Sequence, residues 1–260
     1  MRRHRIIPLV LLLLIIPSAL SAYKLKQEWK KNFAVGETAE FELENVNGAI
    51  EVTVWDRSEI SVTAEIQIKA PSKTKANELY EKLKFIVDAQ GDRVSIEADL
   101  PRIRQVGFSL GDHTSIRIRY DVRVPRQTSL KLKTTNGSIE ARGARGAFDL
   151  ETVNGGIDLL SADGEGRLKT VNGSITCHLD GFFSGGDLEL KTTNGGVELR
   201  LPEGAGGDFY AKTTNGSVRL DFTLEGEVRV KRRQVSGRLG DGRGSIKLRA
   251  TNGNISVDRK

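Results

Sequence analysis

The dipeptide Asn-Gly recurs along this chain at nearly regular spacing. Its asparagines are Asn47, Asn136, Asn154, Asn172, Asn194, Asn215 and Asn252. From Asn136 to Asn215 the copies follow at intervals of 18, 18, 22 and 21 residues, and Ser236-Gly237 stands where an eighth copy is due. Self-similarity at about 20 residues is typical of stacked-repeat proteins. The sequence therefore predicts seven or eight structural units of similar shape.

Apolar residues alternate with polar residues on both sides of each Asn-Gly. The residues four positions before the asparagine are Leu43, Leu132, Leu150, Leu168, Leu190, Ala211 and Leu248, and those three positions after it are Ile50, Ile139, Ile157, Ile175, Val197, Val218 and Ile255. Alternation with a period of two is typical of β-strands with one buried face. Each repeat is thus expected to contain two short strands joined by a tight corner.

Two all-β architectures fit this pattern. The first is a single β-solenoid of about 20-residue, two-strand repeats, in which each coil stacks on the last and equivalent residues form ladders. The second is a meander of antiparallel hairpins, because Asn-Gly between alternating apolar residues is a strong hairpin signal. Threonine recurs two positions before the corner, at Thr134, Thr152, Thr170, Thr192 and Thr213. Stacking explains this repetition better than a meander does, so the solenoid is favoured.

The chain divides into three regions. Residues 1–22 have the order of a secretory signal peptide, with three arginines, an apolar run and small residues. Residues 23–124 form an N-terminal β-region with an expected helix over 72–84 and a hairpin over 85–98, a small insertion that would cap one end of the stack. Residues 125–260 are the Asn-Gly repeat solenoid.

The N-terminal segment and the distribution of charge indicate where the protein is located and where a partner would bind. Cleavage after the signal peptide would leave a chain outside the cytoplasm, in the periplasm, at the cell surface or secreted, with no integral membrane span; retention of the segment as an anchor is the rival reading. The formal charge of +6 then falls to +3, since three arginines leave. Residues 226–260 hold 10 basic and 3 acidic residues, so an electrostatic partner is expected at the C-terminal end.

Four corners carry nearly the same six residues: Thr-Thr-Asn-Gly-Ser-Ile (134–139), Thr-Val-Asn-Gly-Gly-Ile (152–157), Thr-Val-Asn-Gly-Ser-Ile (170–175) and Thr-Thr-Asn-Gly-Gly-Val (192–197). With the signal peptide and the opening of strands and a helix, they resemble the bacterial putative-adhesin, β-strand-repeat family, a domain-of-unknown-function family. The resemblance covers almost all of the mature chain. It implies an exported envelope protein with a repetitive β-fold, and it supplies no catalytic residues.

The sequence predicts no catalytic, cofactor-binding or metal-binding residue. The single cysteine, Cys177, falls in an apolar column, and His178 has no second histidine at ligand spacing. Acidic residues recur one position beyond the corner isoleucine, at Glu51, Glu140, Asp158 and Glu198, with the period of a solvated strand face. The alternative function is a carbohydrate-active β-helix enzyme, a polysaccharide lyase or hydrolase, which would need such carboxylates to converge in a cleft.

One column of outward-facing residues carries a pattern of charges that the fold does not require. Three positions before the corner it reads Glu44, Lys133, Glu151, Lys169, Lys191, Lys212, Arg233 and Arg249, so the last five residues in chain order are cations. Like charges on neighbouring strands are mildly destabilising. The hypothesis is that Lys169, Lys191, Lys212, Arg233 and Arg249 bind a linear anionic polymer of the envelope, such as teichoic acid, lipopolysaccharide core or acidic polysaccharide. The alternative is that they only protect a β-surface from aggregation. Nucleic acid is not expected as a partner, because the chain is exported.

Overall fold

The computed structural model describes residues 22–101, 114–182, 185–240 and 243–259. Over these ranges the chain is all-β apart from one helix, and its architecture is β-solenoid-like, in agreement with the favoured prediction. The expected signal peptide lies outside the described residues, apart from its last position. No helix in the described ranges is long and apolar enough to cross a membrane.

The elements of the N-terminal region are β1 (Tyr23–Ala34), β2 (Thr38–Glu44), β3 (Ile50–Trp55), β4 (Glu59–Ala70), α1 (Lys73–Lys82), β5 (Lys84–Gln90), β6 (Arg93–Asp99) and β7 (Ser115–Pro125). Those that follow are β8 (Gln127–Asn136), β9 (Ile139–Arg142), β10 (Arg145–Asn154), β11 (Ile157–Asn172), β12 (Ile175–Gly181), β13 (Asp187–Asn194), β14 (Val197–Leu201), β15 (Gly207–Asn215), β16 (Val218–Leu220), β17 (Glu225–Lys231), β18 (Gln234–Leu239), β19 (Ser245–Asn252) and β20 (Ile255–Arg259).

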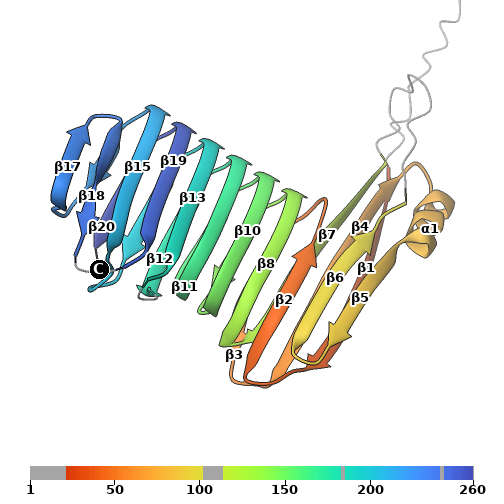
Figure 1. Cartoon of the computed structure of the whole chain (residues 1–260). Helices are drawn as coiled ribbons and strands as arrows, with labels where there is room; N and C mark the ends of the chain where they lie inside the picture. The colour runs from red at the N-terminus through yellow and green to blue at the C-terminus, as the bar shows by residue number, and fades with distance from the viewer. Residues whose placement is uncertain (1–21, 102–113, 183–184, 241–242, 260) are drawn as a thin grey trace, which may run out of the picture.

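The strands form two long rows, which we call the front and back sheets. The front sheet runs in the order β5, β6, β2, β8, β10, β11, β13, β19, β15, β18 and β17. The back sheet runs in the order β1, β4, β7, β3, β9, β11, β12, β14, β20 and β16. The long strand β11 contributes to both rows. Figure 1 shows the front sheet as a continuous row of strands from the helix to the C-terminal end.

Parallel pairing holds the Asn-Gly coils together, and each coil is named here by its asparagine. β10 pairs in parallel with β8 and β11, with Asn154 opposite Asn136 and Asn172. The side-chain amide of each of these asparagines after Asn47 donates to the preceding one in the stack, for example from Asn154 Nδ2 to Asn136 Oδ1 at 2.7 Å. The alternative of an antiparallel hairpin meander is therefore wrong for these coils, because each corner turns the chain into the opposite sheet and leaves its strands to pair with other coils.

The recurrent threonines lie inside the corner. Each is buried, and its hydroxyl donates to a carbonyl of the coil below, as Thr170 Oγ1 does to the Gly155 carbonyl at 2.8 Å. The apolar columns on both sides of the corner form the core between the two sheets; Leu150 and Ile157 are fully buried. Alternation thus places aliphatic side chains inside, while hydroxyls satisfy corner carbonyls that the core would otherwise leave unpaired.

The last coil of the chain does not stack at the end. β19 lies between β13 and β15, and β20 lies between β14 and β16, all in parallel pairing. The stacking order of the coils is therefore Asn47, Asn136, Asn154, Asn172, Asn194, Asn252 and Asn215. The simple expectation that each coil stacks on the previous one in the chain is wrong for this pair of coils.

The eighth corner expected at Ser236 is also wrong. Ser236 lies in β18, which pairs antiparallel with β15 and forms a hairpin with β17. The turn of this hairpin packs on the Asn215 corner, where the amides of Thr213 and Val218 donate to the carbonyls of Arg233 and Arg232. Since β18 occupies the outer edge of β15, the inner edge is the one left for the last coil.

The N-terminal region closes the other end of the stack. β1, β4 and β7 extend the back sheet in antiparallel pairing, and the β5–β6 hairpin extends the front sheet. The helix α1 lies within its predicted range and begins at Ser72, whose hydroxyl accepts from the Lys75 amide. Between the sheets, the rings of Trp29 and Phe85 stack with centroids 4.5 Å apart. These rings fill the wider end, which the short aliphatics of the coils would leave open.

Candidate functional site

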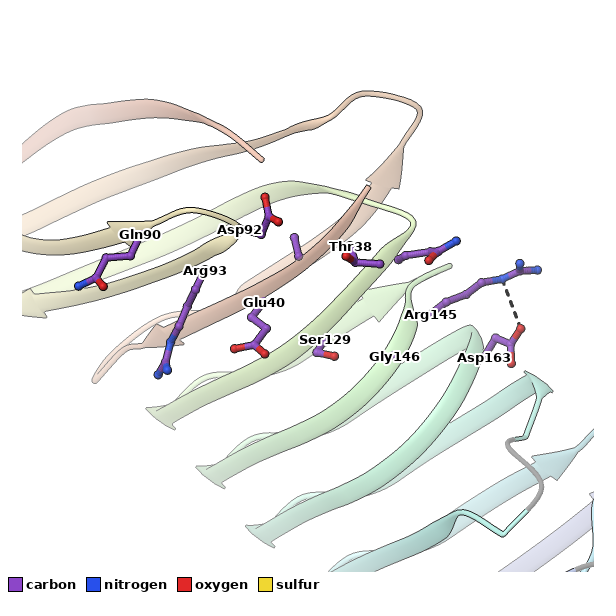
Figure 2. Close-up of a pocket in the computed structure, with 11 residues that line it drawn as sticks. Thr38, Glu40, Gln90, Asp92, Arg93, Ser129, Arg145, Gly146 and Asp163 are labelled. Carbon is purple, nitrogen blue, oxygen red and sulfur yellow. Dashed lines mark ion pairs between the residues drawn. The ribbon is translucent and has the colours of Figure 1, made fainter. Parts of the chain in front are cut away.

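A surface hollow lies at the N-terminal end of the front sheet. It has a volume of about 710 Å³ and lies over β2, β6, β8 and β10. Its labelled lining residues in Figure 2 are Thr38, Glu40, Gln90, Asp92, Arg93, Ser129, Arg145, Gly146 and Asp163. No motif in the sequence marks this hollow, because its residues come from six strands that the stack brings together.

Most of the charges in this hollow are already engaged by the protein. Asp92 Oδ1 accepts the Gly36 amide at 2.6 Å, and Arg145 Nε lies 3.3 Å from Asp163 Oδ2. Arg93 pairs with Glu42 at 3.2 Å, outside the hollow. With acids and bases of the protein neutralising one another, the hollow offers an anionic or cationic ligand little net charge.

A more distinctive surface lies on the outward face of the C-terminal half of the front sheet. Lys169, Lys191, Arg249 and Lys212 stand directly opposite one another on β11, β13, β19 and β15. We call these four residues the basic ladder. All four side chains are exposed, and neighbouring positions are about 4.8 Å apart across the strands.

The same outward column is charge-balanced in the N-terminal half. There Lys133 stands between Glu44 and Glu151, and its Nζ lies 3.4 Å from Glu44 Oε1. In the adjacent column, a hydrogen bond and the charge of Lys131 lower the pKa of the Glu42 carboxyl. None of the basic-ladder cations has an ion pair within 4.0 Å among the described residues. The front face therefore changes from paired to unpaired charge at Lys169.

The structure changes the membership of the predicted cationic column. It brings four of the five predicted residues together, but it places Arg249 between Lys191 and Lys212 because the last coil is inserted there. Arg233 is not in line with them: it lies in the turn between β17 and β18, and Gln234 stands opposite Lys212. The hairpin, which the repeat pattern does not reveal, is the reason for this correction.

Two further residues adjoin the basic ladder, and the sequence indicates only one of them, Lys247, as part of the basic C-terminal end. Lys247 is exposed on β19, between Glu189 and Tyr210 in the adjacent outward column. The Tyr210 ring lies 5.9 Å from the Arg249 guanidinium carbon, in a cation–π contact. The outward position of Lys247 follows from the alternation along β19, but Tyr210 becomes its neighbour only through the insertion of the last coil.

A second groove leads into the basic ladder. It has a volume of about 360 Å³ and crosses β2, β8, β10 and β11 on the front face. Its lining includes Lys133, Glu151 and Lys169, with Val153 exposed at 41% of its surface. The groove therefore runs across the strands, in the same direction as the basic ladder.

The other residues that the sequence singled out lie in the core, on the outer face of the back sheet or at the corners. Cys177 is fully buried in the back sheet, where burial raises the pKa of its thiol to about 12. His178 Nε2 lies 3.0 Å from Glu198 Oε1 on the outer face of the same sheet. The seven asparagines lie at the corners, as positions of a side-chain amide ladder. No group of three or more potential metal ligands gathers in the described ranges.

A family model described as Toastrack DUF4097 matches residues 36–258. Among solved structures, a "putative cell adhesion protein" from Clostridium sporogenes ATCC 15579 is 15% identical, with 91% of this chain and 100% of that chain covered and a TM-score of 0.48. A "putative adhesin" from Bacteroides fragilis NCTC 9343 is 10% identical, with 90% and 97% covered and a TM-score of 0.35. A "putative lipid binding protein" from Parabacteroides distasonis ATCC 8503 is 10% identical, with 90% and 96% covered and a TM-score of 0.25. No curated protein matches the chain.

Proposed function

Because this chain belongs to the Toastrack DUF4097 family, we propose that it is a non-enzymatic, exported binding module of the cell envelope or surface. Its ligand is a linear anionic envelope polymer, and the basic ladder is the binding surface. The observation that carries this proposal is the run of four exposed, unpaired cations on neighbouring strands. The signal peptide predicted for residues 1–22 supports the location.

This arrangement of cations lowers the stability of the sheet, and the fold does not require it. Like charges directly opposite on neighbouring strands destabilise a sheet by a few tenths of a kcal/mol per pair, roughly. The N-terminal half of the same column avoids this cost by alternating Glu44, Lys133 and Glu151. A polyanion that bridges the basic ladder would remove the repulsion, so ligand binding and sheet stability support each other.

The shape of the surface favours an extended ligand over a small one. The cations lie on an open sheet face rather than in an enclosed pocket, and they are about 4.8 Å apart along a line. A chain with a negative charge on each sugar or phosphate can present one group to each strand. The groove beside Lys169 is lined by the exposed Val153 and by charged side chains. Such a chain can therefore continue along the groove beyond the basic ladder.

The enzyme alternative has less support. Of the acids on the back face, Glu51 pairs with Arg119, Glu140 with Arg142 and Glu198 with His178 and Arg200. These carboxylates face solvent along a sheet, each beside its own cation. Lyases and hydrolases use carboxylates or bases that converge on one bond of the substrate.

The test is charge reversal on the basic ladder. The triple variant Lys191→Glu, Arg249→Glu and Lys212→Glu is compared with the wild type for binding to polygalacturonate, a linear polymer with one carboxylate per sugar, with neutral dextran alongside. Exposed ion pairs are worth roughly 0.2–1 kcal/mol each, so reversal of three should weaken binding by at least about tenfold. Binding of the wild type should also fall as salt rises.

A matched control makes the same change in net charge elsewhere. Lys24→Glu, Lys26→Glu and Lys30→Glu alter three exposed lysines of β1, on the back sheet at the other end. This control variant should bind like the wild type. Equal loss in both variants would show that net charge alone attracts the polymer and would overturn the proposed site. Release of reducing ends during incubation would favour the enzyme alternative instead.

A further inference from the structure

The C-terminal end of the front sheet is open at β17. The back sheet ends at β16, whereas the front sheet continues through β18 to β17, which is seen at the far end of the row in Figure 1. All seven residues of β17 are exposed, a property that no other described strand shares. An edge strand of this kind presents unpaired backbone groups and is a template for another strand.

The inner face of this edge is apolar. Val230 stands opposite Val235, which in turn stands opposite Ala211, so Val230 continues a core column of the solenoid. Val235 is buried, but Val230 is 73% exposed and Val228, on the same face, is 41% exposed. The core column thus continues onto β18 and β17, beyond the last strand of the back sheet.

The charges on β17 are arranged with a two-fold complementarity. The strand reads Glu225, Gly226, Glu227, Val228, Arg229, Val230 and Lys231. If two copies pair antiparallel about Val228, each Glu227 faces Arg229 of the other copy and each Glu225 faces Lys231. A shift of the centre by one residue in either direction, which moves the register by two residues, places Glu227 opposite Glu227 or Arg229 opposite Arg229. The Val228 register is the one in which opposite charges face each other throughout.

The backbone of β17 is compatible with that register. Lys231 and Gln234 flank the two-residue turn and face each other, so Val230 directs its backbone groups to the open edge, and continued alternation would direct those of Val228 the same way. The register against β18 shifts between Glu225 and Arg229, which marks a bulge. Bulges and charges discourage indiscriminate edge pairing, so the partner must be one that matches this strand.

We propose that β17 is a self-association surface, through which two copies of this chain form a symmetric antiparallel dimer centred on Val228. The front sheets of the two copies then become one continuous sheet across the β17–β17 pair. Val228 of one copy then faces Val228 of the other, and Val230 faces Gly226 with Val228 of the other copy diagonally beside it. The proposal goes beyond the binding of a polymer, although the dimer would place two basic ladders on one sheet and so provide two sites for the same chain.

The test uses the symmetry of the charges. Sedimentation velocity at increasing concentration of the mature protein should show a monomer that converts to a dimer and to nothing larger. Glu227→Arg and Arg229→Glu, each alone, put like charges opposite each other twice and should weaken the dimer by at least about tenfold. An equimolar mixture of the two variants restores both opposite pairs, so a heterodimer should form.

A disulfide provides a second measurement that does not depend on affinity. In a dimer centred on Val228, the two Val228 Cα atoms are about 5.5 Å apart, within the range that a disulfide spans. Val228→Cys should therefore give a cross-linked dimer under oxidation. Val230→Cys is the control, because it faces Gly226 of the other copy and lies far from its own equivalent. Cys177 is buried and should not interfere.

The outcomes separate this dimer from other arrangements. Growth beyond two copies would indicate head-to-tail contact between β17 and another edge, and would overturn the proposal. A monomer at every concentration, or a mixture that fails to restore association, would overturn it as well. Thermal unfolding of each variant confirms that it is folded, which is expected because all the altered side chains are exposed.

Discussion

The glycine that follows each corner asparagine stands where the neighbouring coil leaves no room for a side chain. A Cβ at Gly155 would overlap with the carbonyl oxygen of Gly137, and a Cβ at Gly173 would overlap in the same way with that of Gly155. The next position is different, since a Cβ at Gly156 would lie 3.3 Å from the Ser174 carbonyl oxygen. The first glycine is therefore required by close backbone stacking, and the second is replaceable.

This difference gives a matched pair of variants in one corner. Gly155→Ala should lower the free energy of unfolding by about 3 kcal/mol or more, because the backbone of the coil must shift. Gly156→Ala should change it by less than about 1 kcal/mol, and the equivalent position carries Ser138 and Ser174 in the adjacent coils. Chemical denaturation of both variants measures the contrast. Equal effects would contradict the stacking explanation.

The Asn252 coil lacks the threonine that the other repeat coils use. Ala250 stands at this position, opposite Thr192 and Thr213 on the flanking strands, and is 6% exposed. A hydroxyl there would reach the Gly195 carbonyl as Thr192 Oγ1 reaches that of Gly173, at 2.8 Å. Ala250→Thr should therefore raise the free energy of unfolding by about 1 kcal/mol. Ala250→Val has nearly the same shape without the hydroxyl, and a similar gain in that variant would refute the hydrogen bond.

At the scale of strands, the front sheet combines a balanced and an unbalanced half. Lys133 lies between two glutamates, whereas Arg249 lies between Lys191 and Lys212. Opposite charges that face each other on neighbouring strands stabilise a sheet by roughly 0.2–1 kcal/mol, and like charges destabilise it. The same substitution in this column should therefore have opposite effects on stability at its two ends.

Arg249→Glu creates two opposite-charge neighbours and should raise the free energy of unfolding by about 0.5–1 kcal/mol, while it weakens polyanion binding. Lys133→Glu creates two like-charge neighbours and should lower the free energy of unfolding by a similar amount. Thermal or chemical denaturation at low salt measures both, and high salt should reduce both effects. A loss of stability in Arg249→Glu would show that the cations are not in mutual repulsion.

For the whole molecule, the order of the coils in space is the property that most affects folding. β19 and β20 are the last strands of the chain, yet they fill a position between strands that precede them. β15 and β16 can reach their final position relative to β13 and β14 only when the C-terminal coil is in place. Completion of the front sheet therefore depends on the end of the chain, and long-range pairing of this kind is slow.

Disulfide trapping tests this order. Glu189 and Lys247 stand opposite each other on neighbouring strands, and so do Lys247 and Tyr210. The double variant Glu189→Cys with Lys247→Cys should form an intramolecular disulfide, since the strands are about 4.8 Å apart. Glu189→Cys with Tyr210→Cys should not, because β19 lies between them and doubles the distance. The reverse result would place the coils in chain order.

The local structure of this protein can be read from its amino-acid sequence. Alternation around each asparagine indicates two strands with one buried face, and the repeated Thr, Asn and Gly indicate corners that stack on their equivalents. The helix after Ser72 is also readable, from its cap and its apolar spacing. These features depend on interactions within one coil or with any similar coil beside it.

The order in which the coils stack depends instead on contacts between distant parts of the chain. The apolar columns and corner residues of all coils are nearly the same, so any coil offers its neighbour similar pairing, and no local signal ranks the choices. The β17–β18 hairpin decides the matter, because it occupies the outer edge of β15 and leaves the inner edge to β19. Because of this hairpin, Arg233 lies outside the cationic column and Arg249 lies between Lys191 and Lys212.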